Sequence, residues 1–204
     1  KNASNCDGDV IIVHAKKREL DFVEKGFGVK RFNLMYNDFI IVGPKNNSAK
    51  IIISDNPEDA FKKIFNTSSI FISRGDDSGT HFKEMSIWTK AELKPRQFSG
   101  SWYREVGSGM GATLNLASGM GGYTITDRAS WVNFSNKNDL KILTEKNKLL
   151  FNQYGITMVN PLKCPNTNSN DAKKFINWLI SPKGQDKIKN FKVKNQQLFF
   201  PNAN

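Results

Sequence analysis

The sequence predicts an α/β protein with mixed sheets. Short apolar runs rich in β-branched residues, such as 10–13 and 39–42, are typical of buried strands. Segments with apolar residues at helical spacing separate these runs, and glycine or proline marks several ends, as at Gly43-Pro44. Because such strands and helices alternate along the whole chain, the pattern indicates an α/β architecture without internal repeats.

The first part of the chain contains three expected strands and two expected helices. In order, we expect a strand at 9–14, a helix at 18–25, a strand at 39–42, a helix that begins with Asn56 as N-cap and Pro57 as first residue, and a strand at 70–73. Leu20 and Val23 are expected on the inner face of the first helix.

The second part of the chain is expected to contain more helix. We first expect a helix from Thr80 to Leu93 with Phe82, Met85 and Trp88 inward, and then a helix opened by the Gly-rich turn 107–111 and closed by Gly119. A strand at 123–126, a short helical turn capped by Asp127 and a strand at 155–160 follow. The last two expected elements are a helix capped by Ser169 or Asn170, with Phe175 among its inner residues, and a helix restarted at Ser181-Pro182.

Composition places the chain among globular proteins with a basic surface. Of its 204 residues, 38% are hydrophobic and 24% are charged, and the net charge is +11. Such a balance is compatible with a basic solvated surface, steering of small anions, an acidic membrane surface or nucleic acid. Because lysine and arginine are scattered and no nucleic-acid-binding module is found, we expect no nucleic-acid partner. No apolar run approaches the length of a membrane span.

The cysteines and histidines do not form a metal-binding pattern. Cys6 and Cys164 permit at most one internal disulfide, and two cysteines are too few for a cysteine-based zinc site. His14 and His81 lie in unlike contexts without the spacing of metal ligands. We therefore expect no metal site, and both histidines are interpreted as ordinary polar residues.

The run Ser73–Thr80, Ser-Arg-Gly-Asp-Asp-Ser-Gly-Thr, is the strongest candidate for a binding site. It lies between an apolar strand and a helix, so free backbone N–H groups and the positive end of the helix dipole meet there. Arg74 adds a planar fork of donors suited to the oxygens of a tetrahedral anion, and Ser78 and Thr80 add hydroxyl groups. This arrangement predicts an oxyanion ligand.

Other interpretations of this region are weaker. The tripeptide Arg74-Gly75-Asp76 also occurs in adhesion proteins, but matches of three residues are common by chance. Ser78 lacks the Gly-x-Ser-x-Gly elbow of a serine nucleophile, and adjacent carboxylates beside Arg74 are better explained by a salt-linked loop than by an acid/base pair. We therefore expect no catalytic residue.

Five segments resemble the TupA family of tungstate-binding ABC-transporter receptors. They keep the order of the family and spread over nearly the whole chain: Asp9–Ala15, Asn37–Pro44, Ser73–His81, Gly121–Arg128 and Ser181–Gln185. The motif Arg-x-Asp-x-Ser-Gly-Thr also resembles the anion-binding loop of phosphate-binding periplasmic proteins.

The resemblance implies a periplasmic-binding-protein fold. Two α/β lobes with mixed sheets would be joined by two crossover strands, with the oxyanion bound between the lobes. Residues 1–45 and 151–204 would form the first lobe with the crossover strands, and residues 46–150 the second lobe with the anion loop. The Thr/Ser-rich opening loop of the family is not found in this sequence, so the first lobe is expected to be incomplete.

The resemblance also implies the residues of the site and its ligand. The anion would be bound by Arg74, Ser78, Gly79 and Thr80, with Ser73 and Asp76 in support. The ligand would be tungstate or molybdate, with no cofactor. These dianions only accept hydrogen bonds, whereas phosphate near pH 7 keeps a proton and can use a carboxylate acceptor. An Asp76 paired with Arg74 would therefore have no influence on which anion binds, whereas an Asp76 facing the ligand would favour phosphate.

The implied function is that of an extracytoplasmic solute-binding protein of an ABC importer. Its partners would be the oxyanion and the membrane permease, and it would reside in the periplasm or outside the cytoplasmic membrane, with a lipid anchor as an option for the full-length form. Three alternatives stay open: a molybdate or phosphate receptor, an intracellular oxyanion-sensing domain of a regulator, and an enzyme acting on phosphate esters.

Overall fold

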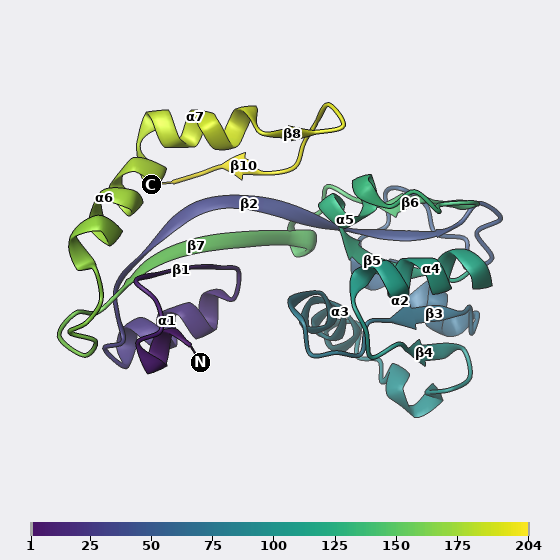
Figure 1. Cartoon of the computed structure of the whole chain (residues 1–204). Coiled ribbons are helices and arrows are strands. Elements are labelled where there is room, and N and C mark those ends of the chain that lie inside the picture. Colours follow the sequence, from purple (N-terminus) through teal and green to yellow (C-terminus); the bar gives the residue numbers. More distant parts are fainter. Residues whose placement is uncertain (1, 204) are drawn as a thin grey trace. The chain divides into compact units, whose positions relative to one another are not determined.

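The structure is a computed structural model that describes residues 2–203, and these residues form two compact units. The first unit contains the chain up to Asn37 and again from Asn152 onwards, and the second contains Asp38–Phe151. Both units combine strands with helices, so the α/β prediction is confirmed (Figure 1). The long strand β2 (Gly28–Pro44) contributes residues to both units.

The first unit is built around strands β1, β7, β2 and β10, which are neighbours in that order. The pairs β1–β7 and β2–β10 are antiparallel, with Val10 opposite Met158 and Phe200 opposite Tyr36. Besides β2, the elements of this unit are, in chain order, a 3₁₀ turn (Ala3–Asn5), β1 (Val10–Val13), α1 (Lys16–Glu24), β7 (Phe151–Val159), α6 (Ser169–Ile180), α7 (Pro182–Asn190), β8 (Lys192–Val193), β9 (Gln196–Gln197) and β10 (Phe200–Pro201).

Helices cover both faces of this sheet. Figure 1 shows α6 and α7 on one side and α1 on the other. Leu34, Ile156 and Ile176 form the buried core between the sheet and α6. Phe175 was expected to point inward but is 44% exposed, because α6 turns Ala172 and Ile176 toward the core instead.

Two further predictions for this unit are wrong. Strand β1 was expected to be fully buried, but Ile12 is 39% and Val13 38% exposed. Leu20 of α1 was expected inside and is 49% exposed, while the neighbouring Glu19 is buried. Glu19 is buried because its carboxylate accepts hydrogen bonds from the Ala15 amide and from the Arg31 guanidinium. These bonds fix a different face of α1 against the sheet than the apolar pattern predicts.

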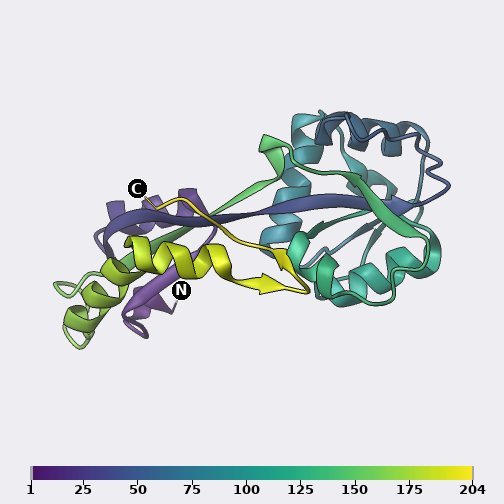
Figure 2. The same cartoon turned by 90° about the horizontal axis from the view of Figure 1, so that it is seen from above.

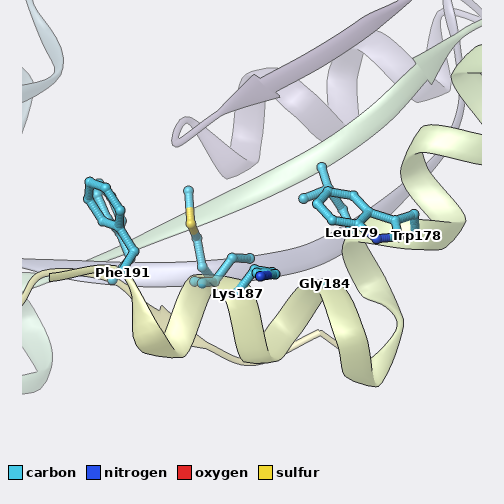
Figure 3. A pocket seen from close by; sticks show the side chains of 8 residues that line it. Trp178, Leu179, Gly184, Lys187 and Phe191 are labelled. Carbon is cyan, nitrogen blue, oxygen red and sulfur yellow. The ribbon is translucent and has the colours of Figure 1, made fainter.

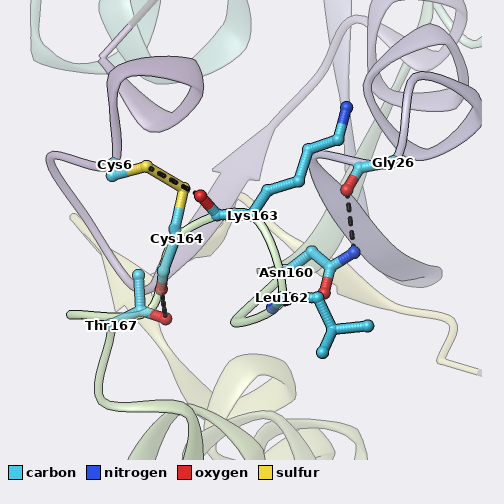
Figure 4. Close-up of a disulfide and its surroundings, with 7 residues drawn as sticks. All are labelled: Cys6, Gly26, Asn160, Leu162, Lys163, Cys164 and Thr167. Atoms are coloured by element: carbon cyan, nitrogen blue, oxygen red, sulfur yellow. Dashed lines mark hydrogen bonds between the residues drawn. A yellow bond between two sulfur atoms is a disulfide. The ribbon is translucent and has the colours of Figure 1, made fainter.

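A disulfide between Cys6 and Cys164 closes the first unit (Figure 4). The two residues are 158 positions apart in the sequence, and their Cα atoms are 5.3 Å apart. The Thr167 hydroxyl donates to the Cys164 carbonyl at 2.7 Å, and the Asn160 amide donates to the Gly26 carbonyl at 2.8 Å. The start of the chain is thus covalently held to the turn that follows β7.

The second unit contains a mixed sheet. β2 is antiparallel to both β5 and β6, whereas β3 runs parallel to β4. A parallel bridge between Phe71 and Tyr123 links the two sets of strands. The elements of this unit are α2 (Pro57–Asn66), β3 (Phe71–Ser73), α3 (Gly79–Lys90), β4 (Tyr103–Glu105), α4 (Met110–Met120), β5 (Thr124–Asp127), α5 (Arg128–Asn133) and β6 (Leu140–Thr144), with 3₁₀ turns at Pro95–Phe98 and Lys148–Leu150.

Alternate residues of β2 face two different cores in this unit. Phe39 and Ile41 pack in a cluster with Phe61 of α2 and Trp88 of α3. Ile40 and Val42 belong to a second cluster, which contains residues of α4 and α5. The sheet therefore lies between the helix pair α2 and α3 and the pair α4 and α5 (Figure 2).

Side-chain caps fix several helix starts where the sequence predicts them. Asn56 accepts a hydrogen bond from the Asp59 amide, Asp127 from the Ser130 amide and Ser181 from the Gly184 amide. The cap of α6 is Asn168, one residue before the predicted position. In the part of the chain described here, no helix has both the length and the apolar character needed to cross a bilayer.

Candidate functional site

The candidate loop, residues 74–78, connects the buried strand β3 to the first turn of α3. It turns sharply because Gly75 and Asp77 have φ values of 59° and 56°. Ser78 is the N-cap of α3, and its hydroxyl oxygen accepts a hydrogen bond from the His81 amide at 3.3 Å. The loop therefore delivers Ser78 to the N-terminal end of a helix, as the sequence predicts.

Within the loop, Asp76 is held by its neighbours. The Arg74 guanidinium donates from Nε and Nη2 to Asp76 Oδ2, at 3.1 and 2.6 Å. The other carboxylate oxygen accepts from the Ser78 amide at 3.2 Å. Arg74 and Asp76 are both about four-fifths buried, with 19% and 20% of their side chains exposed. The predicted role of Asp76 in orienting Arg74 agrees with this geometry.

These contacts also influence the protonation of Asp76. Partial burial raises its pKa, but the hydrogen bonds from Ser78 and Arg74 together outweigh burial and leave the pKa below its usual value. Asp76 is therefore ionised at neutral pH, and its charge is paired with that of Arg74.

Several donors of the site residues have no acceptor among the described residues. They are the backbone N–H groups of Gly79 and Thr80, the Thr80 hydroxyl and the Nη1 group of Arg74. The Ser78 side chain is hydrogen-bonded to the Asp76 carboxylate and to the His81 amide, so its hydroxyl is engaged within the loop. Two features favour a negatively charged ligand here, namely the unpaired N–H groups at the N-terminus of α3 and the guanidinium beside them.

His81 supports the loop in a way that the sequence analysis missed. Its side chain is only 3% exposed, and its Nδ1 accepts a hydrogen bond from the Asp77 amide at 3.0 Å. The bond holds the left-handed conformation of Asp77. His81 is thus part of the loop's scaffold, and only its position one turn into α3 could have suggested this.

Ser73 and Glu84 form a buried polar cluster behind the loop. The Ser73 hydroxyl, at the end of β3, donates to Glu84 Oε2 at 2.8 Å. Tyr103 of β4 and Trp88 of α3 donate to the other carboxylate oxygen at 2.8 and 3.1 Å. Ser73 and Glu84 are both fully buried. Ser73 therefore faces the interior of the unit, away from the free donors of α3, which agrees with a supporting role.

The environment of Glu84 raises the pKa of its carboxyl group to about 7. Burial is the largest cause, and the hydrogen bonds from Ser73, Tyr103 and Trp88 only partly oppose it. Sequence analysis predicts Phe82, Met85 and Trp88 on the inner face of α3, but Phe82 is 47% exposed. Trp88 is buried and Met85 packs against the core, so the prediction is confirmed for these two residues and wrong for Phe82. The buried face also includes the hydrogen-bonded Glu84 and His81, which an apolar pattern does not detect.

A pH-dependent stability follows from Glu84. Because its folded pKa lies above the usual value of 4.5, its contribution to stability is largest below pH 4.5 and is lost as the pH rises toward 7. We expect this carboxyl group to lower the free energy of unfolding by about 3 kcal/mol over that range. Urea unfolding at pH 5 and pH 8 should show the decrease in the wild type and not in Glu84→Gln. The exposed Glu92→Gln is the control and should retain it.

Arg128 is engaged elsewhere in the second unit. Its guanidinium donates to both carboxylate oxygens of Asp38, at 2.7 and 2.5 Å, and to Glu145 at 2.8 Å. Asp127 caps α5. Both residues have structural partners, which supports leaving them out of the ligand site.

A separate groove lies in the first unit, lined by residues of α7, the end of α6 and strand β2 (Figure 3). It has a volume of about 290 Å³, and its lining is mostly apolar: Met35, Trp178, Leu179, Gly184, Lys187, Ile188, Phe191 and Phe199. With one lysine as its only charged residue, this groove is poorly suited to a dianion. Among residues 2–203, no group of three or more His, Cys, Asp or Glu side chains is arranged to hold a metal ion.

Comparison with known proteins identifies relatives of this chain. A protein of Haloferax volcanii that carries the name of an ABC transporter anion-binding protein is 43% identical over 208 residues. The match covers all of this chain but only 60% of that protein's length. The tungstate-binding protein TupA of Peptoclostridium acidaminophilum is 43% identical over 202 residues, which cover 97% of this chain and 69% of TupA.

A solved structure and a family model agree with these relatives. The tungstate-binding protein TupA of Desulfovibrio alaskensis G20 is 42% identical and superposes with a TM-score of 0.91, covering 100% of this chain and 82% of that one. The model of the PBP superfamily domain matches residues 1–183. Both TupA relatives carry the name of a tungstate-binding protein. This chain thus belongs to the PBP superfamily and, within it, to the TupA family of ABC-transporter binding proteins.

Proposed function

We propose that this protein is an extracytoplasmic solute-binding protein that captures tungstate for an ABC importer. The anion is held by Arg74, Ser78, Gly79 and Thr80, with Ser73 and Asp76 in support. The two compact units correspond to the two lobes, with residues 46–150 in the lobe that carries the anion loop. β2 and β7 serve as the crossover strands.

The observation that carries the proposal is the pairing of Asp76 with Arg74. Both Asp76 oxygens already accept hydrogen bonds, so Asp76 is engaged within the loop. The neighbouring Asp77 carboxylate is 85% exposed and is not part of this pairing. A tungstate or molybdate dianion has no hydrogen to donate and matches such a site. Hydrogen phosphate needs an acceptor for its proton, and Asp76 is already engaged by Arg74 and Ser78. The loop therefore favours tungstate or molybdate over phosphate.

The disulfide supports a location outside the cytoplasm. Disulfides persist in oxidising compartments and are rare in the reducing cytosol, so the bond between Cys6 and Cys164 argues against the alternative of an intracellular sensing domain. The names of the TupA relatives support tungstate as the ligand. A membrane permease would then receive the anion, and a lipid anchor would retain the full-length protein at the membrane.

Titration calorimetry of the intact protein with tungstate, molybdate, sulfate and phosphate tests this proposal. We expect one tungstate or molybdate per chain. Phosphate should bind more weakly by a factor of about 100, because the Asp76 carboxylate that could accept its proton is paired with Arg74. Equal affinity for phosphate, or no binding of any of the four anions, would contradict the proposal.

A further inference from the structure

We propose that Glu84 is a positioning residue that couples proton uptake to oxyanion binding: Glu84 is neutral when the anion is bound, and its charge opposes binding when it is ionised. This inference rests on the proposed function, because it concerns the anion that the loop before α3 would hold. Glu84 does not contact the ligand in this proposal. Its charge acts on the anion over the first turns of α3, and its hydrogen bonds join that helix to the strand before the loop.

The geometry of the Glu84 cluster is the first argument. Its carboxylate receives three hydrogen bonds, from Ser73, Tyr103 and Trp88, and none of these donors carries a positive charge. No ion pair to Glu84 is formed within residues 2–203. The other charged group that acts on it is Glu105 of β4, and that charge opposes ionisation of Glu84. An ionised Glu84 is therefore a buried charge without a counter-charge.

The second argument is the position of Glu84 relative to the free donors. Gly79 and Glu84 are five residues apart in α3, which corresponds to about 7.5 Å along the helix axis. A dianion at the N-terminus of α3 and a carboxylate one and a half turns away repel each other, and the buried surroundings screen this repulsion less than water does. The neutral form of Glu84 removes the repulsion, so the anion binds that form more tightly.

The third argument is that the proton is available at neutral pH. Burial raises the pKa of Glu84 to about 7, so both protonation states are populated near that pH. Binding of a dianion then draws a proton from the buffer onto those Glu84 carboxylates that are still ionised, so the uptake at pH 7 is a fraction of a proton per chain, and release of the anion returns it. The neutral carboxyl group can donate its hydrogen to the Ser73 oxygen, which keeps the strand and the helix joined behind the loop.

Titration calorimetry with tungstate at pH 7, in PIPES and in imidazole buffer, measures this proton directly, because the two buffers differ in their heat of ionisation. We expect net proton uptake by the wild type and none by Glu84→Gln, which keeps the side-chain size but cannot ionise. We also expect the wild type to bind tungstate about tenfold more tightly at pH 6 than at pH 8.5. Glu84→Gln should show the same affinity at both pH values.

Two further variants separate Glu84 from other causes. His81 contacts the loop through the Asp77 amide, and His81→Asn tests whether its imidazole supplies the proton; the uptake should persist in this variant. Tyr103→Phe removes a donor to the carboxylate, so the midpoint of the affinity profile should move to higher pH. A merely structural cluster would change the affinity of these variants without moving the midpoint.

The outcomes distinguish this inference from the proposed function. Tungstate binding by the wild type without proton uptake, or uptake that persists in Glu84→Gln, overturns the role of Glu84 and leaves the binding function standing. Absence of tungstate binding at every pH overturns both. If Glu84→Gln does not fold, an unshifted midpoint in Tyr103→Phe still contradicts the proposal.

Discussion

Replacing Arg74 with alanine should remove high-affinity tungstate binding and leave the second unit folded. Arg74 contributes charge-assisted hydrogen bonds, and each such bond contributes about 1.5–3 kcal/mol. The change also leaves the Asp76 carboxylate without its cation, because Arg74 Nε and Nη2 are its partners in the loop. The affinity for tungstate, measured by calorimetry, should decrease by a factor of at least about 100.

Matched controls isolate the role of Arg74. Arg104→Ala removes the same charge from an exposed position of the same unit, so it should change the affinity only slightly. Arg74→Lys keeps the charge but not the planar fork and should lie between the wild type and Arg74→Ala. An affinity of Arg74→Ala within a factor of about 3 of the wild type would refute the assignment of the site.

Reduction of the disulfide should destabilise the first unit strongly. The bond between Cys6 and Cys164 closes a loop of 158 residues, and the chain-entropy relation gives about 5 kcal/mol for a loop of that length that is unfolded throughout, and less while the second unit within it stays folded. We expect this smaller loss in the free energy of unfolding of the first unit, in the Cys6→Ala, Cys164→Ala double variant as well as after reduction. Hydrogen exchange followed segment by segment measures it.

The second unit provides the internal reference for that experiment. It contains no cysteine, so amide exchange in α3 and in strands β3 to β5 should keep its wild-type rate. Exchange in β1 and α6 should accelerate. Unchanged protection of β1 and α6 after reduction would show that packing alone maintains the first unit.

Local signals predicted much of the second unit and its candidate loop. The predicted N-cap residues Asn56 and Asp127 precede their helices at the expected spacing, and an N-cap requires only contacts within three residues. For the same reason, the salt link between Arg74 and Asp76 was predictable from their separation of two residues. Interactions between residues that are close in the sequence can therefore be predicted from the sequence.

Contacts between distant parts of the chain escaped prediction. Glu84 is buried because Ser73 and Tyr103, 11 and 19 residues away in the sequence, supply donors to it. The burial of Glu19 likewise depends on Arg31, 12 residues further on. An apolar pattern does not distinguish a polar residue that is buried with its partners from an exposed one. Leu20 of α1 and Phe82 of α3 were therefore assigned wrongly to the inner faces, whereas Trp88 was assigned correctly.

The discontinuity of the first unit has a consequence for the order of folding during synthesis. The second unit is one uninterrupted stretch, so all of its residues have emerged while the chain from Asn152 onwards is still being made. The first unit can complete its folding only later, because its sheet contains β7 and β10 beside β1 and β2, and its disulfide requires Cys164. We therefore expect the anion-loop unit to be folded before the residues around Cys6 find their partners.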